Sequence, residues 1–298
     1  MNGIIIVDKP KNFTSFDVIA KLRRKLGQRK IGHMGTLDPM ATGVLPILLG
    51  DTAKFQIFAP DNDKSYTAKM KFGITTDTLD ITGQVISKQK SEITKQDLER
   101  VLNLFLGEIY QIPPMFSAVK KDGVKLCDLA RRGISVERDR RKVIINDIKI
   151  LNFDFENQEA EISIDCSKGT YIRTLCDDVG GALGCGATVS ELRRTSSNGF
   201  AERDALPLAK IVEMDPEDIY QKCVLPTEKL FENFPVAVVT TAQSIRFRNG
   251  GFLAMERVKF DGSAQEGVRY RVYCGDEFIG LGEVNKATDE LKVLKCLK

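Results

Sequence analysis

Histidine and aspartate, two side chains that enzymes use for catalysis, stand close together in one short segment. His33 is the single histidine of the 298 residues, and Asp38 follows five residues later. Residues 32–46 around them contain three glycines and two prolines, too many for one continuous helix or strand. Since a residue before proline favours extended backbone, Asp38 projects its carboxylate outward. The segment fits either a structural turn or a shaped loop that carries chemistry.

Several other kinds of site find no support in the sequence. No Gly-x-Ser-x-Gly motif accompanies His33, which argues against a Ser-His-Asp hydrolase. No Gly-x-x-x-x-Gly-Lys-Ser/Thr loop is present, so hydrolysis of a nucleoside triphosphate is unsupported. The seven cysteines form no Cys-x-x-Cys pair and lack histidines for zinc. We therefore expect reduced, mostly buried thiols in a cytosolic protein with no export signal or membrane span.

The small net charge of +3 hides an uneven distribution along the chain. Residues 8–34 carry a local charge of +6 and residues 116–143 one of +5, which leaves −8 for the remainder. Two basic segments on an acidic body indicate a face that binds a polyanion. A solvated charged surface without a partner is the alternative reading of such runs.

We expect an α/β (α+β) fold with a mixed, largely antiparallel sheet and flanking helices. A strand is expected at residues 4–7, and a capping box at Thr14 and Asp17 opens a helix that ends at Gly27 and buries Phe16. A short helix is expected around residues 53–58. Residues 66–72 alternate like a strand. A second capping box at Thr94 opens a helix that closes at residue 107.

The second half of the chain divides into an irregular insert, further sheet elements and a distinct tail. Residues 110–142 are irregular and basic, with a short helix over residues 126–131. Strands at 143–151 and 159–166 precede a helix at 170–183, and two polar stretches, 196–207 and 215–226, are expected to lead away from this body. Short β-rich runs with glycine turns then predict a small β-barrel domain. We expect domains at 1–232 and 233–298.

Several motifs together resemble the TruB family of tRNA pseudouridine synthases. The longest is Gly32-His33 with Gly35, Leu37-Asp38-Pro39 and Ala41-Thr42-Gly43-Val44-Leu45-Pro46. The further matching segments are Asp8-Lys9-Pro10 with Thr14-Ser15, Lys64-Ser65-Tyr66, Ile112-Pro113-Pro114 with Ser117-Ala118-Val119-Lys120, Ser167-Lys168-Gly169-Thr170-Tyr171-Ile172-Arg173, and Leu192-Arg193-Arg194. The resemblance covers about residues 3–195. By position, the tail resembles the family's PUA-like RNA-binding module.

The resemblance implies roles for particular residues. Asp38 would act as the carboxylate on the ribose or base, Arg173 would keep it ionised, and Tyr66 would stack on the target base and could move a proton at carbon 5. His33 would fill the gap left by a flipped uridine. Residues that would bind the substrate or support the site are Lys9, Tyr171, Leu192 and, in the insert, Lys120, Arg131 and Arg132. Asp77 and Asp80 are expected to be turn carboxylates, with a second catalytic acid as the alternative.

The implied function is isomerisation of uridine 55 in the T loop of tRNA to pseudouridine. The implied protein is a cytoplasmic monomer with a pseudouridine synthase fold, without a cofactor, metal, protein partner or guide RNA. One rival is an RNA-binding protein that remodels tRNA without chemistry, and the other is a related guide-RNA-dependent enzyme. A carboxylate at position 38 with Tyr66 and Arg173 favours the enzyme over the pure binder. The sequence leaves open which step Asp38 performs.

Overall fold

The fold is built on one large sheet covered by two groups of helices. The computed structural model describes residues 1–60 and 63–297. Ten strands form the large sheet in the order β14-β1-β3-β12-β4-β11-β10-β7, with β2 beside β3 and β13 beside β12. These strands are β1 (Gly3–Lys9), β2 (Ile31–His33), β3 (Thr42–Leu49), β4 (Lys64–Phe72), β7 (Gly107–Gln111), β10 (Arg141–Asp154), β11 (Glu159–Cys166), β12 (Ala187–Ser197), β13 (Phe200–Ala201) and β14 (Leu206–Pro207).

The pairing in this sheet is mixed and mostly antiparallel, as expected. Among the described strand pairs of this sheet, only β1 with β14 and β3 with β12 run parallel. The two parallel contacts join strands that lie far apart in the sequence. The β1–β3 half of the sheet is therefore completed by strands that come late in the chain.

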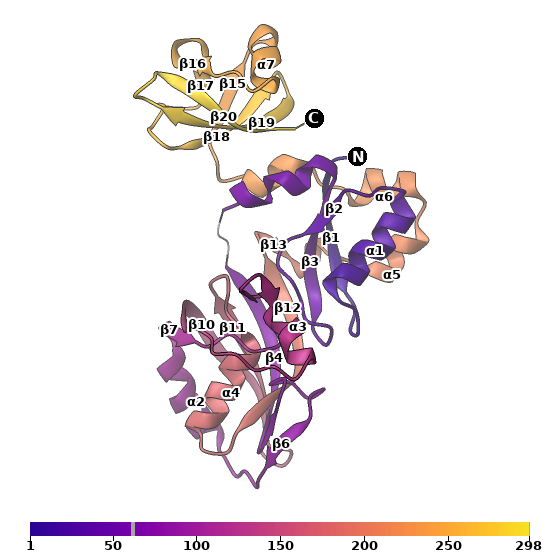
Figure 1. Ribbon diagram of the computed structural model, residues 1–298, viewed down its shortest axis with the longest axis vertical. Helices are drawn as coiled ribbons and strands as arrows, with labels where there is room; N and C mark the ends of the chain where they lie inside the picture. Colours follow the sequence, from indigo (N-terminus) through magenta and orange to yellow (C-terminus); the bar gives the residue numbers. More distant parts are fainter. Residues whose placement is uncertain (61–62, 298) are drawn as a thin grey trace.

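Helices cover the sheet in two groups, one on each half (Figure 1). The helices are α1 (Ser15–Leu26), α2 (Lys95–Leu102), α3 (Leu126–Arg131), α4 (Ile172–Ala182), α5 (Leu208–Glu213), α6 (Pro216–Cys223) and α7 (Thr241–Arg248), with 3₁₀ turns η1 (Gly50–Phe58), η2 (Asn103–Phe105), η3 (Glu202–Asp204), η4 (Thr227–Phe231) and η5 (Met255–Arg257). In Figure 1, α1, α5 and α6 lie beside β1–β3, while α2 and α4 lie over β4, β10 and β11. No helix within residues 1–60 and 63–297 has the length and apolarity needed to cross a membrane.

The local signals of the first helix are confirmed, with one error. The Thr14 hydroxyl accepts from the Asp17 backbone, the Asp17 carboxylate accepts from the Thr14 backbone, and Gly27 closes α1 at φ 60°. Val18, Ile19 and Leu22 face the core. The prediction that Phe16 is buried is wrong: its ring is 61% exposed and lies against the guanidinium of Arg23. An aromatic ring one residue into the helix points away from the sheet here.

Several strand and helix predictions are also confirmed. β4 buries alternate residues from Tyr66 to Phe72, and β11 buries Ala160, Ile162, Ile164 and Cys166. The capping box at Thr94 opens α2. That helix stops at Leu102, however, and residue 107 begins strand β7 rather than closing the helix.

Two predictions about irregular segments are wrong. The second half of residues 32–46 is strand β3, which contains Pro46. The Pro46 carbonyl accepts from the Met34 amide, and proline has no amide to donate in return, just where β2 ends. The stretches 196–207 and 215–226 do not lead away from the body. With the residues between them they form β13, β14, α5 and α6; β14 pairs with β1, and α5 packs on α1 and β1.

The tail forms a separate curled sheet in the upper part of Figure 1. Its strand order is β16-β20-β19-β18-β15-β17. The strands are β15 (Val236–Val239), β16 (Leu253–Ala254), β17 (Lys259–Phe260), β18 (Arg269–Cys274), β19 (Glu277–Asn285) and β20 (Glu290–Cys296). This curled sheet agrees with the PUA-like expectation, although α7 was not predicted. The boundary at residue 233 stays a prediction.

The tail has its own core and also shares apolar contacts with the large sheet. Ala237, Val272 and Ile279 belong to its own buried cluster. Phe278 joins a different cluster, in which it packs against Phe55 of η1 at 6.1 Å between ring centroids. This shared cluster holds the tail against the outer face of β1 and β3.

Two small hairpins form separate two-stranded sheets, and the second belongs to the insert. β5 (Ile74–Thr76) pairs with β6 (Val85–Lys88), and β8 (Lys120–Lys121) pairs with β9 (Val124–Lys125). The second hairpin leads directly into α3, whose predicted bounds are confirmed.

Candidate active site

A cavity of about 290 Å³ lies at the centre of the large sheet, where five segments meet. They are the loop after β2, the start of β4, the insert after β7, the start of α4 and the middle of β12. Of the predicted residues, the structure brings together Asp38, Tyr66, Tyr171, Arg173 and Leu192 on its walls. Segments distant in sequence therefore converge on one carboxylate.

The loop that carries Asp38 is fixed by backbone contacts from β1 and α1. The Ser15 hydroxyl accepts from the Leu37 amide at 2.9 Å, and the Asn12 amide donates to the Pro39 carbonyl at 2.8 Å. The Lys9 ammonium donates to the carbonyls of Pro10, Phe13 and Pro39. These contacts hold the loop in one shape.

The position of Lys9 agrees with one of its two predicted roles, support of the loop. Its side chain is fully buried, and its ammonium is occupied by three carbonyl oxygens. Burial lowers the pKa of Lys9 to about 8, while the nearby Asp38 charge opposes that fall. Lys9 therefore supports the loop from inside, and its contact with RNA stays a prediction.

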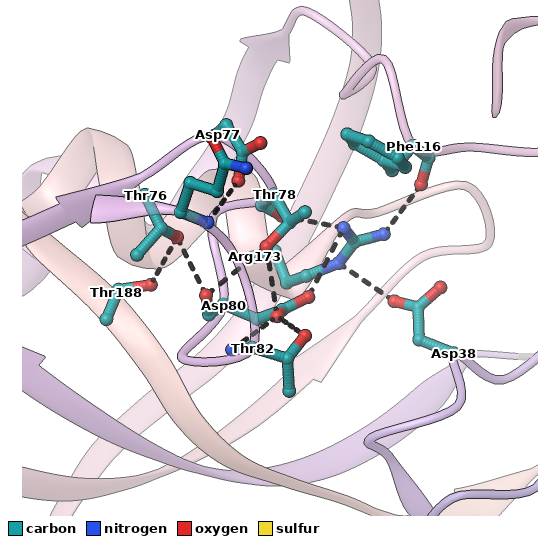
Figure 2. A network of polar contacts seen from close by, with 10 residues as sticks. Asp38, Thr76, Asp77, Thr78, Asp80, Thr82, Phe116, Arg173 and Thr188 are labelled. Atoms are coloured by element: carbon teal, nitrogen blue, oxygen red, sulfur yellow. Dashed lines mark hydrogen bonds and ion pairs between the residues drawn. The ribbon is translucent and has the colours of Figure 1, made fainter. Parts of the chain in front are cut away.

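Arg173 holds the Asp38 carboxylate from the first turn of α4. Its Nε lies 2.9 Å from Asp38 Oδ2, and only 5% of the arginine side chain is exposed against 35% of the aspartate. Nη1 donates to the Thr78 carbonyl and Nη2 to the Phe116 carbonyl, both at 2.8 Å. Figure 2 shows the guanidinium at the centre of these contacts. The same side chain thus orients the carboxylate and ties the insert to the cavity wall.

Asp80 adds a second carboxylate to the other edge of Arg173. Its Oδ2 lies 3.7 Å from Arg173 Nη1 (Figure 2). Its Oδ1 accepts from the Thr78 hydroxyl and from the amide and hydroxyl of Thr82. Asp80 is therefore the turn carboxylate that was predicted, and it is also part of the network behind Asp38. It does not line the cavity.

Burial and the Arg173 charge have opposite effects on the pKa of the Asp38 carboxyl. Burial raises the pKa of the Asp38 carboxyl above its ordinary value, because the ionised form loses solvation. The Arg173 charge and hydrogen bond oppose this rise, and the Asp80 charge adds to it. A carboxylate held this way, facing a small cavity, can act as a nucleophile or a base.

Tyr66 faces the same cavity from β4. Burial raises the pKa of its phenol, and the charge of Arg194 on the neighbouring strand opposes that rise. Tyr171 also lines the cavity just before α4, where Gln111 holds its backbone amide and carbonyl. Leu192 contributes an apolar wall.

The remaining predicted residues lie outside the cavity wall. His33 is on β2, partly buried, and its Nδ1 is buried with no hydrogen-bond partner in the described residues. Burial and the Arg194 charge lower the pKa of His33. Lys120, Arg131 and Arg132 are exposed on the insert, and Arg131 pairs with Asp128 of its own helix. Their contact with RNA stays a prediction.

The sequence analysis assigned no role to three features of the cavity wall, and it did not predict the contact of Asp80 with Arg173. Arg194 and Lys64 line the cavity, and so do the insert residues 116–118. Asp80 shares Arg173 with Asp38. Lys64 and Arg194 belong to the motifs that contain Tyr66 and Leu192. Closeness in sequence to those residues was the only indication that they belong to the site. Nothing in the sequence placed Asp80 beside Arg173.

Comparison with known proteins gives matches along the chain. Residues 23–172 match the family described as TruB family pseudouridylate synthase (N terminal domain), and residues 173–232 match tRNA pseudouridylate synthase B C-terminal domain. The tRNA pseudouridine synthase B of Clostridium tetani is 42% identical over 298 residues, with all of both chains covered. That of an Azoarcus species is 40% identical, covering 95% of this chain and 91% of its own.

Solved structures with a similar fold cover almost the whole chain. A Cbf5-Nop10-Gar1 complex contains a chain with a TM-score of 0.73 and 26% identity, and the match covers 99% of this chain and 84% of that one. An H/ACA RNP bound to a substrate RNA containing 2′-deoxyuridine gives a TM-score of 0.74 at 24% identity, covering 99% and 85%. The large sheet and the curled tail are thus both found together in known structures.

Proposed function

Because the chain belongs to the TruB family of pseudouridylate synthases, we propose that it converts uridine 55 in the T loop of tRNA to pseudouridine. Pseudouridine synthases are isomerases, and the chain is an enzyme of that class. Its curated relatives are named for tRNA, which supports tRNA as the substrate here. The reaction breaks the C–N glycosidic bond and joins the ribose to carbon 5 of the same base.

The observation that carries the proposal is the Asp38 carboxylate held 2.9 Å from a buried Arg173 on the wall of a small cavity. Small-molecule sites run from about 300 to 1,000 Å³, so a cavity of about 290 Å³ suits one flipped nucleotide better than a larger ligand. In this proposal Asp38 acts on the ribose or the base, and Arg173 favours its ionised form.

The other cavity residues have matching roles in the proposal. Tyr66 stacks on the uracil and takes part in proton movement at carbon 5, while Tyr171 and Leu192 hold the nucleotide. His33 fills the space that the flipped uridine leaves, which offsets part of the unstacking cost of roughly a few kcal/mol. Its lowered pKa supports a neutral imidazole in this role rather than an acid.

The exposed cations of the insert are proposed to bind the tRNA backbone. Lys120, Arg131 and Arg132 point away from the core, and phosphate contacts of this kind position an RNA without reading its sequence. We propose that the protein works as a monomer without a guide RNA. The relatives at about 40% identity carry names that mention tRNA alone. A tRNA substrate would place the enzyme in the cytoplasm.

The test is pseudouridine mapping on an unmodified tRNA transcript incubated with the protein alone. We expect one new pseudouridine at position 55, formed without any added RNA or cofactor. Binding without conversion would favour the RNA-remodelling alternative, and conversion only with an added guide RNA would favour the guide-dependent one. Asp38→Asn provides the inactive control.

A further inference from the structure

Arg194 on β12 is a fully buried arginine with no carboxylate partner among the described residues. Its Nε donates to the Val44 carbonyl at 2.7 Å, and its Nη2 donates to the Gly35 carbonyl at 2.9 Å. Its Nη1 is buried and has no hydrogen-bond partner in the described part of the chain. A buried guanidinium is costly unless its charge is compensated. Two carbonyls compensate it only in part, so this cation calls for a functional explanation.

The side chain opposite Arg194 is Tyr66. The two residues are paired in register between the antiparallel strands β12 and β4. Directly opposite residues of such a pair project from the same face of a sheet. Both side chains also line the cavity that holds Asp38. The guanidinium therefore lies on the same face of the sheet as the phenol, and both face the substrate cavity.

Isomerisation to pseudouridine requires one proton to leave carbon 5. After the ribose has joined carbon 5, that carbon still carries its hydrogen, and loss of this proton restores the double bond between carbons 5 and 6. A second proton is taken from solvent by N1, which the broken glycosidic bond has left free. A basic oxygen close to carbon 5 is needed for the first transfer.

We propose that Arg194 is a positioning residue that keeps the Tyr66 oxygen oriented and electrostatically prepared to accept the proton from carbon 5. The proposal rests on the proposed function. The phenol first releases its own proton to solvent, and the resulting phenolate takes the proton from carbon 5 and returns to the phenol. No oxidant or co-reactant is involved, and the protons balance across the reaction.

The other charges around Tyr66 show why Arg194 is needed. Burial raises the pKa of the phenol, and the charge of Asp38 across the cavity raises it further. The Cys166 thiol on β11, whose pKa burial raises to about 11, stays neutral beside it. Lys64, two residues earlier on β4, is a further cation at the cavity, and burial lowers its pKa. Among the groups around Tyr66, Arg194 opposes this rise most strongly, through its charge.

The test removes the charge of Arg194 and measures the proton step itself. Arg194→Gln keeps a hydrogen-bonding side chain without charge, whereas Arg194→Lys keeps the charge. Single-turnover rates are measured across pH on tRNA whose target uridine carries hydrogen or deuterium at carbon 5. The matched control is Arg193→Gln, because Arg193 on the same strand pairs with Asp8 and Glu202, away from the cavity.

We expect Arg194→Gln to slow conversion by about 100-fold or more near neutral pH, the usual range for an impaired general base. The alkaline limb of its pH–rate profile should move up by about one unit or more, and the deuterium isotope effect should rise. Arg194→Lys should recover part of the rate. Arg193→Gln should stay within about threefold of the wild type.

A double-mutant comparison separates this role from a structural one. In a Tyr66→Phe background, Arg194→Gln should cost less than about threefold more, because the group it acts on is gone. Additive losses, or a slow Arg194→Gln variant with an unchanged pH profile and isotope effect, would overturn the proposal. If the Gln variant does not fold, the Lys variant is compared in the same way. A wild-type protein that forms no pseudouridine would instead contradict the proposed function.

Discussion

Replacing Arg173 by methionine should move the acid limb of the pH–rate profile to higher pH. The proposed reaction needs Asp38 ionised, so the rate falls as pH drops through the pKa of this carboxyl in the folded protein. Burial raises that pKa and the Arg173 charge opposes the rise. Without the guanidinium, burial and the Asp80 charge act unopposed by Arg173. The ionised form then requires a higher pH.

The size of the shift follows from the geometry. Two unit charges 2.9 Å apart interact by about 6 kcal/mol at an effective dielectric constant of about 20, and by about 1.4 kcal/mol in water. Asp38 keeps 35% of its side-chain surface exposed, so screening places the value below the upper figure. With about 1.36 kcal/mol per pH unit, and 1–3 units typical of an Asp–Arg pair, we expect a shift of about 1–3 units.

The assay is the single-turnover rate on unmodified tRNA from pH 5 to 9. Arg173→Lys serves as the charge-conserving comparison and should move the limb by less than about one unit. Because Arg173 also holds the carbonyls of Thr78 and Phe116, tRNA binding and thermal unfolding are measured on both variants. An Arg173→Met enzyme that folds, binds tRNA and keeps the wild-type acid limb would refute the reasoning.

Three further predictions concern the carboxylate, the insert and the histidine. Asp38→Asn should lower turnover by on the order of 10³–10⁶ while tRNA binding stays nearly intact, and activity within tenfold of wild type would contradict this. Removing four insert arginines together should flatten the slope of log tRNA affinity against log salt concentration by up to about 3–4 units. An unchanged slope would mean that the insert does not contact the RNA phosphate backbone. These four are Arg131, Arg132, Arg140 and Arg141. His33→Gln should recover much of the activity that His33→Ala loses, with no pH limb disappearing in single-turnover measurements. Equal defects in both variants, with loss of a titration, would make His33 an acid or base.

Local sequence signals predicted the elements that depend on nearest neighbours. The capping boxes at Thr14 and Thr94 set the starts of α1 and α2, because each pair satisfies its own backbone amides within four residues. The alternation from Tyr66 to Phe72 set β4, because one face of that strand meets the core. Asp38 was found through a long motif rather than through its surroundings.

Contacts between distant segments could not be predicted in the same way. Strand β12 was missed because it is polar and bulged, with register shifts that interrupt its alternation. Arg194 within it reads as a surface charge, and only pairing with β4 shows that it is buried beside Tyr66. Arg173 reaches Thr78 across 95 positions of sequence, and Asp80 lies in the same turn. No periodicity or residue spacing in the sequence indicates that Arg173 contacts Thr78 and Asp80.

The late parallel partners of β1 and β3 have a consequence for synthesis on the ribosome. The carbonyl of Val44, on β3, accepts from Arg194, which is synthesised 150 residues later. Strand β14, which pairs with β1, is synthesised later still. At roughly 5–20 residues per second, that interval is about 8–30 s. During it, the nascent chain carries two strands with unpaired edges, which are prone to associate with other chains. Because Leu192 and Arg194 line the cavity, a nascent chain that has not reached residue 194 lacks part of the wall around Asp38.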